Sequence, residues 1–139
     1  MLYKAIKYIL ENDSDFATAI GTDSDSDVKV YPIHPRRKVE LPFCVFNIID
    51  QRGNPTKDTN SQMDDIRIRV VVYDTELDDV IDLAEKARTA MAAYKNGGTV
   101  AGVELVTVDF ESMNDTFEEG YGNRGAIGIE IDFEIWSTQ

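Results

Sequence analysis

Cysteine and histidine are nearly missing from this chain. Its 139 residues include one cysteine, Cys44, and one histidine, His34. A disulfide within the chain needs two cysteines, and catalysis by a serine or cysteine with a histidine base would depend on His34 alone. Cys44 lies in the apolar run Phe43 to Ile49, which predicts a buried, reduced thiol. His34 stands between Ile33 and Pro35, which predicts a solvent-exposed loop residue rather than a base or a metal ligand.

Long apolar runs are also missing. No segment approaches the roughly 18 consecutive apolar residues that would span a bilayer. The start of the chain, Met1 to Leu10, includes Lys4 and Lys7 and has neither an uninterrupted apolar segment nor a small-residue cleavage site. We therefore expect no signal peptide and no membrane contact, and a soluble chain made in a cytoplasm.

Positive charge is scarce. Fourteen Lys and Arg residues face 26 Asp and Glu residues, which gives a formal net charge of -12 at pH 7. Such a surface repels nucleic acid phosphates and anionic membranes, so binding to duplex DNA is not expected. The composition, 42% hydrophobic and 29% charged, is that of a folded domain, and the length suits a single domain over residues 1–139.

Two segments alternate like half-buried strands, Ile66 to Tyr73 and Ile127 to Trp136. Their apolar faces consist of Ile66, Ile68, Val70, Val72, Ile127, Ile129, Ile131, Phe133 and Ile135. Their opposite faces carry Arg67, Arg69, Glu130, Asp132 and Glu134. If the two strands pair antiparallel, arginines meet carboxylates across the strands, which favours that register over alternatives. The alternative is that both are ordinary solvent-exposed faces.

Weaker patterns complete the prediction of an α+β domain. Helical spacing predicts an N-terminal helix over Met1 to Leu10 with one more turn at Phe16 to Ile20, and a long helix over Glu76 to Tyr94. The long helix is expected to start with a capping box of Thr75 and Asp78 and to pack on one face of the sheet. Its expected buried stripe is Leu77, Val80, Ile81, Ala84, Ala87, Met91 and Tyr94.

The sheet is predicted to be mostly antiparallel, with about four strands. Besides the two alternating segments, we expect a short edge strand at Val28 to Tyr31, a central strand at Phe43 to Asp50 and a strand at Val103 to Phe110. Residues 51–65 and 112–125 are polar and lack periodicity, which predicts two mobile loops that contact partner proteins. The candidate contact residues in them are Arg52, Asn54, Lys57, Asp58, Met63, Phe117, Tyr121 and Arg124.

Sequence motifs for chemistry are not found. Asp23, Asp25 and Asp27 have the spacing of a calcium loop, but Val28 and His34 occupy the positions that need Gly and Glu. The glycine clusters lack the lysine and the strand-to-helix placement of a phosphate-binding loop. We therefore predict a chain that is not an enzyme and has no catalytic residues, cofactor or metal.

Four segments together resemble the tail-completion or tail-terminator family of long-tailed bacteriophages. They are Val30 to Pro32, Leu41 to Phe46, Ile68 to Tyr73 with the helix that follows, and Ile131 to Trp136. The resemblance lies in the order and spacing of the segments over nearly the whole chain, and it includes no site motif.

This resemblance implies a structural protein of virion assembly that forms a ring at the head-proximal end of the tail tube. The ring would be a homo-hexamer in the virion, would stop tube polymerisation and would bind the major tail tube protein and the head connector or completion protein. Assembly would take place in the host bacterial cytoplasm, and the free oligomeric state stays open. DNA would pass through without specific binding, and Glu130, Asp132 and Glu134 are candidates for an acidic lumen face. The alternatives are a head-completion or connector protein and a small-ligand-binding α+β domain.

Overall fold

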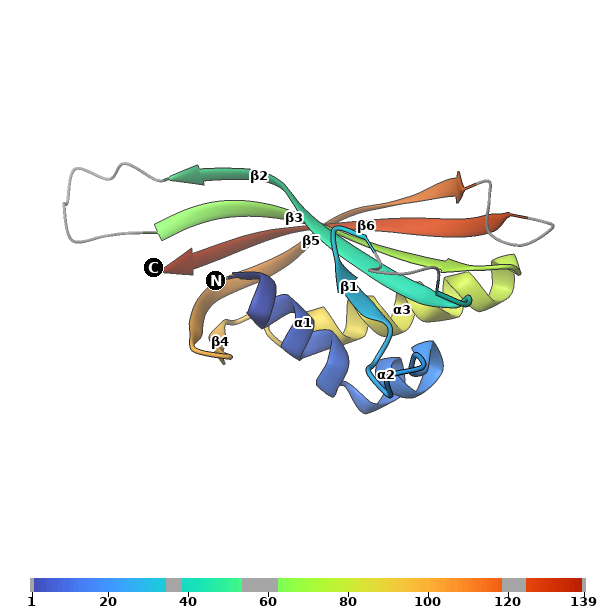
Figure 1. The fold of residues 1–139 in the computed structure, drawn as a ribbon. Helices are drawn as coiled ribbons and strands as arrows, with labels where there is room; N and C mark the ends of the chain where they lie inside the picture. Colours follow the sequence, from blue (N-terminus) through green and yellow to red (C-terminus); the bar gives the residue numbers. More distant parts are fainter. Residues whose placement is uncertain (1, 35–38, 54–62, 119–124, 139) are drawn as a thin grey trace.

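A computed structural model describes residues 2–34, 39–53, 63–118 and 125–138. Within these ranges the chain forms a single domain of three helices and one six-stranded sheet (Figure 1). The helices are α1 (Leu2–Asn12), α2 (Ser14–Ile20) and α3 (Leu77–Ala92). The strands are β1 (Val30–Pro32), β2 (Phe43–Gly53), β3 (Met63–Asp74), β4 (Gly98–Val100), β5 (Val103–Glu118) and β6 (Ala126–Thr138).

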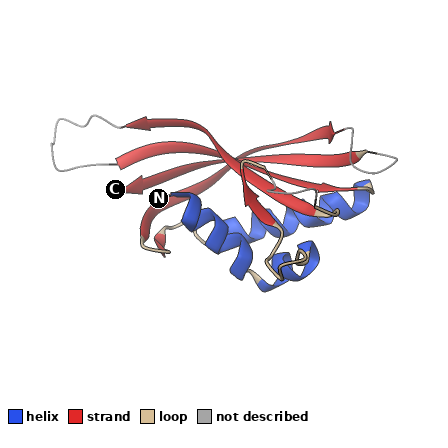
Figure 2. Cartoon of the chain, viewed as in Figure 1, coloured by secondary structure: helices blue, strands red, loops and turns tan. Residues whose placement is uncertain are grey.

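The domain has two layers. All three helices lie on one side of a strongly twisted sheet, and no described helix covers the other side (Figure 2). The strand order is β1-β2-β3-β6-β5-β4, with β1 parallel to β2 and every other pair antiparallel. The predicted architecture of a mostly antiparallel sheet with helices on one face is therefore confirmed.

The predicted number of strands is too low. The structure has six strands within the described ranges, because β4 is a three-residue strand that begins at Gly98, directly after Gly97, and is too short to show alternation. The prediction of a central strand at Phe43 to Asp50 is also wrong, since β3 and β6 occupy the centre and β2 lies second from the edge. Apolar residues occur on both faces of β2 because Phe43 packs on Tyr73, with ring centres 5.2 Å apart, away from the main core.

The core fills the space between helices and sheet, and the two alternating strands supply its base. Ile66, Ile68, Val70 and Val72 of β3 are buried, as are Ile129, Ile131, Phe133 and Ile135 of β6. Ile127 is partly buried against this core. Cys44 is fully buried, as predicted, and burial raises the pKa of its thiol above the usual range.

The buried apolar stripe predicted for α3 is only partly right. Val80, Ala84, Ala87 and Met91 are buried, whereas Leu77 and Ile81 are 48% and 42% exposed. Leu83 is buried in the core instead. Helical spacing gives the apolar side of a helix, but it does not show how far a helix extends beyond the elements it packs on.

The predicted capping box of α3 is not formed. The helix begins after Glu76, whose side chain makes no capping hydrogen bond, and Thr75 donates its backbone N–H to the carboxylate of Asp74 at 2.7 Å. Asp78 and Asp79 in the first turn still complement the helix dipole. A side-chain cap is instead present at α2, where Asp13 accepts the backbone N–H of Phe16 at 2.9 Å.

Both predicted loops are shorter than expected because the strands extend into them. β2 continues to Gly53 and β3 starts at Met63, while β5 runs to Glu118 through most of the predicted second loop. Bulges explain the error, because the register shifts between Ile48 and Asp50 in β2 and between Phe110 and Ser112 in β5. A bulge interrupts the period of two, so the sequence pattern ends where the strand does not.

Candidate functional site

The charged residues of β3 and β6 come together on the side of the sheet that carries no described helix. We call this side the uncovered face; its charged and polar residues include Asn47, Arg67, Arg69, Ser112, Glu130, Asp132 and Glu134. Arg67 is paired with Glu134, Arg69 with Asp132 and Val71 with Glu130 in the register of the two strands. Residues paired across antiparallel strands project to the same side, so the predicted meeting of arginines and carboxylates is confirmed.

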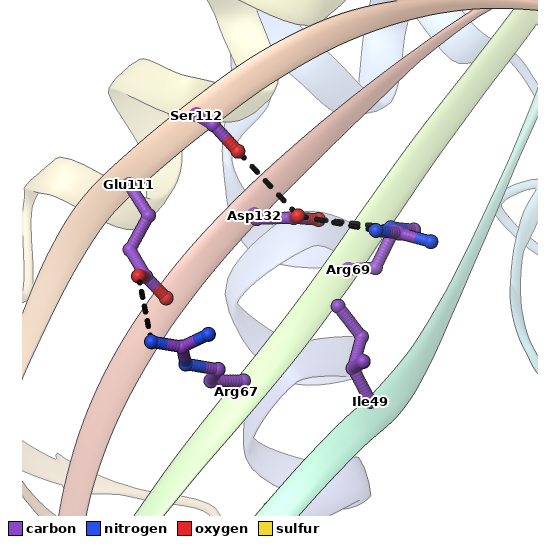
Figure 3. Close-up of a pocket in the computed structure, with 6 residues that line it drawn as sticks. All are labelled: Ile49, Arg67, Arg69, Glu111, Ser112 and Asp132. Atoms are coloured by element: carbon purple, nitrogen blue, oxygen red, sulfur yellow. Dashed lines mark hydrogen bonds and ion pairs between the residues drawn. The ribbon is translucent and has the colours of Figure 1, made fainter.

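Arg69 is the most strongly held of these side chains. Its Nε and Nη2 donate to the two carboxylate oxygens of Asp132 at 2.9 and 3.2 Å (Figure 3). Glu130 lies 3.6 Å from the same Nε, and the hydroxyl of Ser112 donates to Asp132 at 3.4 Å. The hydrogen bonds to Asp132 raise the pKa of Arg69. Bidentate contacts of this kind fix the relative orientation of the guanidinium and carboxylate groups and favour their charged forms.

Arg67 is held less tightly than Arg69. Although Glu134 faces it in the strand register, the Arg67 side chain forms its ion pair with Glu111 of β5, at 3.4 Å. The Arg67 side chain is 53% exposed. Glu134 accepts the indole N–H of Trp136 at 3.1 Å. Arg67 is therefore the more available of the two arginines for a contact outside the chain.

A shallow open cavity of about 190 Å³ lies between these groups. Its walls are Ile49, Arg67, Arg69, Glu111, Ser112 and Asp132 (Figure 3). Ile49 and Glu111 are the extra residues of the bulges in β2 and β5, and bulges redirect side chains in this way. Sequence reasoning missed these two residues because alternation alone gives no signal for a bulge.

The acidic triplet at Asp23 forms a turn. One carboxylate oxygen of Asp23 accepts the backbone N–H groups of Asp25 and Asp27, at 2.9 and 3.1 Å, and the other accepts the hydroxyl of Tyr31 at 2.9 Å. This arrangement is an Asx-type turn joined to the start of β1. Over the described ranges, no group of three or more His, Cys, Asp or Glu side chains is placed to hold a metal.

The predicted contact residues do not form one site. Arg52 lies in β2 and Met63 in β3 near one end of the sheet, while Phe117 lies in β5 near the other end (Figure 1). Their predicted loop conformation is wrong, because all three are strand residues. The remaining candidates, Asn54, Lys57, Asp58, Tyr121 and Arg124, lie outside the described residues.

The uncovered face presents pairs of opposite charges on the surface of the sheet. Its two arginines contact Glu111, Glu130 and Asp132, and Ser112 and Trp136 donate hydrogen bonds to Asp132 and Glu134. Of the helices that the structure describes, none is long and apolar enough to cross a membrane.

No protein-family model and no curated protein matches the sequence. Among solved structures, the fold is similar to that of a chain in the virion of a native gene transfer agent particle, with a TM-score of 0.67. The match covers 97% of this chain and 92% of that chain at 13% sequence identity. At this identity the likeness establishes a shared fold over nearly the whole of both chains.

Proposed function

We propose that this chain is a structural protein of a phage-like virion, and within that class the tail terminator or completion protein. The observation that carries the proposal is the fold shared with a chain of a gene transfer agent virion, because it extends over almost the full length of both proteins. The finer assignment comes from the four sequence segments that resemble the tail-terminator family. In this role the chain forms a ring, proposed to be hexameric, at the head-proximal end of the tail tube.

The surface chemistry suits a ring that DNA passes through. The net charge of -12 repels phosphate groups, and the carboxylates of Asp132 and Glu130 hold Arg69. An arginine engaged in this way is less available to trap a phosphate than a free one. A lumen lined by Glu130, Asp132 and Glu134 would thus be a mixed surface of paired charges rather than uniformly acidic.

The proposed partners are other copies of the chain, the major tail tube protein and the head connector or completion protein. The role requires neither a catalytic site nor a cofactor, and it places the chain in the virion tail, with assembly in the bacterial cytoplasm.

The test is electron microscopy of particles from the element that carries this gene, with the gene deleted and then restored. Tails of uncontrolled length that fail to join DNA-filled heads are the expected result, and restoring the gene returns normal particles. Tails of normal length that remain unjoined would move the assignment to a head-completion or connector protein. Normal infectious or transducing particles without the gene would contradict any assembly role.

A further inference from the structure

One edge of the sheet is open along the second half of β2. β1 pairs only with Cys44 to Phe46, and the last described contacts on this side are from Ile33 N–H to the Phe46 carbonyl at 2.8 Å and from Ile48 N–H to the Tyr3 hydroxyl at 3.3 Å. From Ile49 to Gly53, no backbone partner lies on this side in the described part of the chain. These residues form the free β2 edge.

The opposite edge is open along the second half of β5. β4 pairs only with Val103 to Leu105, and the Lys95 carbonyl then accepts the N–H of Val108 at 3.4 Å. From Asp109 to Glu118, the described residues supply no further backbone partner on this side. This stretch is the free β5 edge, and unpaired strand edges of such length are templates for pairing with another chain.

The two free edges lie at opposite corners of the sheet. Asp50 of β2 stands in the same cross-strand row as Asp109 of β5, through Arg67 and Glu134. The free β2 edge extends from this row toward the end with Gly53, and the free β5 edge extends from it toward the other end. At each end of the sheet, one edge is covered and the other is open.

The side chains along the free edges favour pairing of β5 with β2 rather than of β5 with itself. Asp109, Glu111 and Asp115 make the β5 edge acidic, so two such edges would repel each other. The β2 edge is neutral rather than acidic, because Arg52, whose side chain is 77% exposed, forms an ion pair with Asp50 at 2.9 Å. Both edges also expose large apolar side chains: Phe110, Phe117 and Ile49.

We propose that the free β5 edge of one copy pairs antiparallel with the free β2 edge of the next copy, so that the sheets join into one closed ring. Within a copy, β5 runs antiparallel to β2 because three antiparallel pairings separate them. Rotation about a ring axis preserves strand direction as seen along that axis, so β5 meets the next β2 antiparallel. Such head-to-tail contacts close into rings when the rotation allows it. The closed ring rests on the proposed function, whereas the edge pairing follows from the sheet itself.

The offset between the edges has the size that ring closure needs. The middle of the free β5 edge, near Asn114, is displaced along the strands from Gln51 and Arg52 by about 18 Å, at about 3.3 Å per residue. The four long strands of each copy span about 19 Å, at about 4.8 Å per strand. A stagger of about 18 Å per about 19 Å of width tilts the strands by roughly 43° from the ring axis, close to the 35–45° typical of closed sheets.

The direction of the offset predicts which face lines the ring. β3 and β5 are parallel and are joined through α3, a crossover that is right-handed in nearly all proteins. An observer facing the helices with β3 pointing up therefore sees β5 to the right of β3. The free β5 edge is then at upper right and the free β2 edge at lower left. In a ring, the free β5 edge of one copy must lie at the same height as the free β2 edge of the next copy. Each copy must therefore rotate clockwise in this view, so that its strands run up and to the right. Strands in closed, right-twisted sheets have this tilt when the sheet is seen from outside. The helices thus face outward and the uncovered face lines the lumen.

Engineered disulfides test the pairing, because the single native thiol at Cys44 is buried. We pair Gln51→Cys or Arg52→Cys with Asn114→Cys or Asp115→Cys in the full chain, and we analyse concentrated protein and restored particles on non-reducing gels. Cysteines on paired strands lie within disulfide distance, so at least one double variant is expected to give a ladder of covalent multimers. The control is Gln51→Cys with Glu104→Cys, which lies on the covered part of β5 and should give no ladder.

Each alternative gives a different pattern. Covalent dimers from Asn114→Cys alone would show that β5 pairs with β5, and those from Gln51→Cys alone that β2 pairs with β2; either would overturn the proposal. The absence of multimers from all four double variants in restored particles would also overturn the edge pairing. This holds even if the gene deletion gives tails of uncontrolled length, which would support the proposed function. A ladder combined with normal particles after gene deletion would retain the edge pairing and reject the proposed function.

Discussion

Arg69 and Asp132 are 63 positions apart in the sequence and form a two-pronged ion pair across the centre of the sheet, with N–O distances of 2.9 and 3.2 Å. The Asp132 side chain is only 17% exposed, so without Arg69 its carboxylate would be a poorly solvated charge.

The first prediction follows from this pair. Arg69→Ala or Asp132→Ala should each lower the free energy of unfolding by about 1–3 kcal/mol, because each removes the two hydrogen bonds between these groups. Among the described side chains, the first variant leaves Asp132 with Ser112 only, and the second leaves Arg69 with the longer contact to Glu130. The double variant should cost clearly less than the sum of the two, as measured by urea denaturation in a double-mutant cycle. Asp82→Ala, which removes the more exposed ion pair with Lys86, is the control and should change stability by no more than about 0.5 kcal/mol. Strictly additive losses for Arg69 and Asp132 would show that the two do not interact.

The second prediction concerns two glycines with similar φ angles. Gly97 has a φ of 89° and Gly102 a φ of 80°, so alanine at either position adopts an unfavourable left-handed conformation. At Gly97 an added Cβ would also lie 2.5 Å from the Leu105 carbonyl oxygen, whereas at Gly102 it would meet no atom within 4 Å. Gly102→Ala should cost about 1 kcal/mol and Gly97→Ala about 1–3 kcal/mol more, in the same denaturation measurement. Equal losses would mean that the turn after α3 relaxes away from β5.

The third prediction concerns pH. Lys29 is 8% exposed, and its ammonium group donates to the Glu40 carbonyl at 3.2 Å. Burial lowers its pKa below the usual 10.5, so between the lowered pKa and 10.5 the unfolded chain binds more protons than the folded chain. The contribution of this lysine to stability therefore rises with pH across that window.

The measurement compares wild type with Lys29→Met from about pH 8 to about pH 10.5, near the ordinary lysine range. The stability of the wild type relative to the variant should increase with pH, and taking the difference removes titrations that the two proteins share. Lys4→Met at an exposed position controls for the loss of one positive charge. A difference that stays flat or falls with pH would contradict the effect of burial.

The fourth prediction concerns the lumen of the proposed ring. If the chain assembles into this ring, a cysteine on the uncovered face should react more slowly with a large polymer-linked maleimide than one on the helical side, because the lumen restricts access. Asn47→Cys is the test position and Glu85→Cys, exposed on α3, is its control. Because Asn47 is half-buried and Glu85 is exposed, the rate at each position is divided by its own rate with a small thiol reagent in the free chain. Slower reaction at Glu85→Cys in assembled particles would reverse the orientation of the ring.

The central strands could be predicted from the sequence because their signal is local. The alternation of Ile66 to Tyr73 and of Ile127 to Trp136 indicated which residues are buried, and the charges on the opposite faces indicated how the strands pair. The contact of Arg67 with Glu111 could not be predicted, because it depends on a bulge that shifts β5 relative to β6. Similar reasoning applies to Leu77 and Ile81, whose exposure depends on tertiary packing around the start of α3.

The candidate site also combines residues that could be predicted from the sequence with residues that could not. Glu130 and Asp132 were predicted as face residues, and the structure adds that Arg69 holds both. Ile49, Glu111 and Ser112 complete the cavity and came from segments where the sequence pattern breaks down. Long-range geometry of this kind depends on register, and register is fixed by the whole sheet rather than by any one strand.

The long ladder between β3 and β6 has a mechanical consequence. Its pairs run without a register shift from Met63 with Thr138 to Asp74 with Ile127. A force along the strands loads all the hydrogen bonds of such a ladder simultaneously, whereas a force across them breaks the bonds one after another. The centre of this domain therefore resists shear along the strand direction far better than peeling from either end.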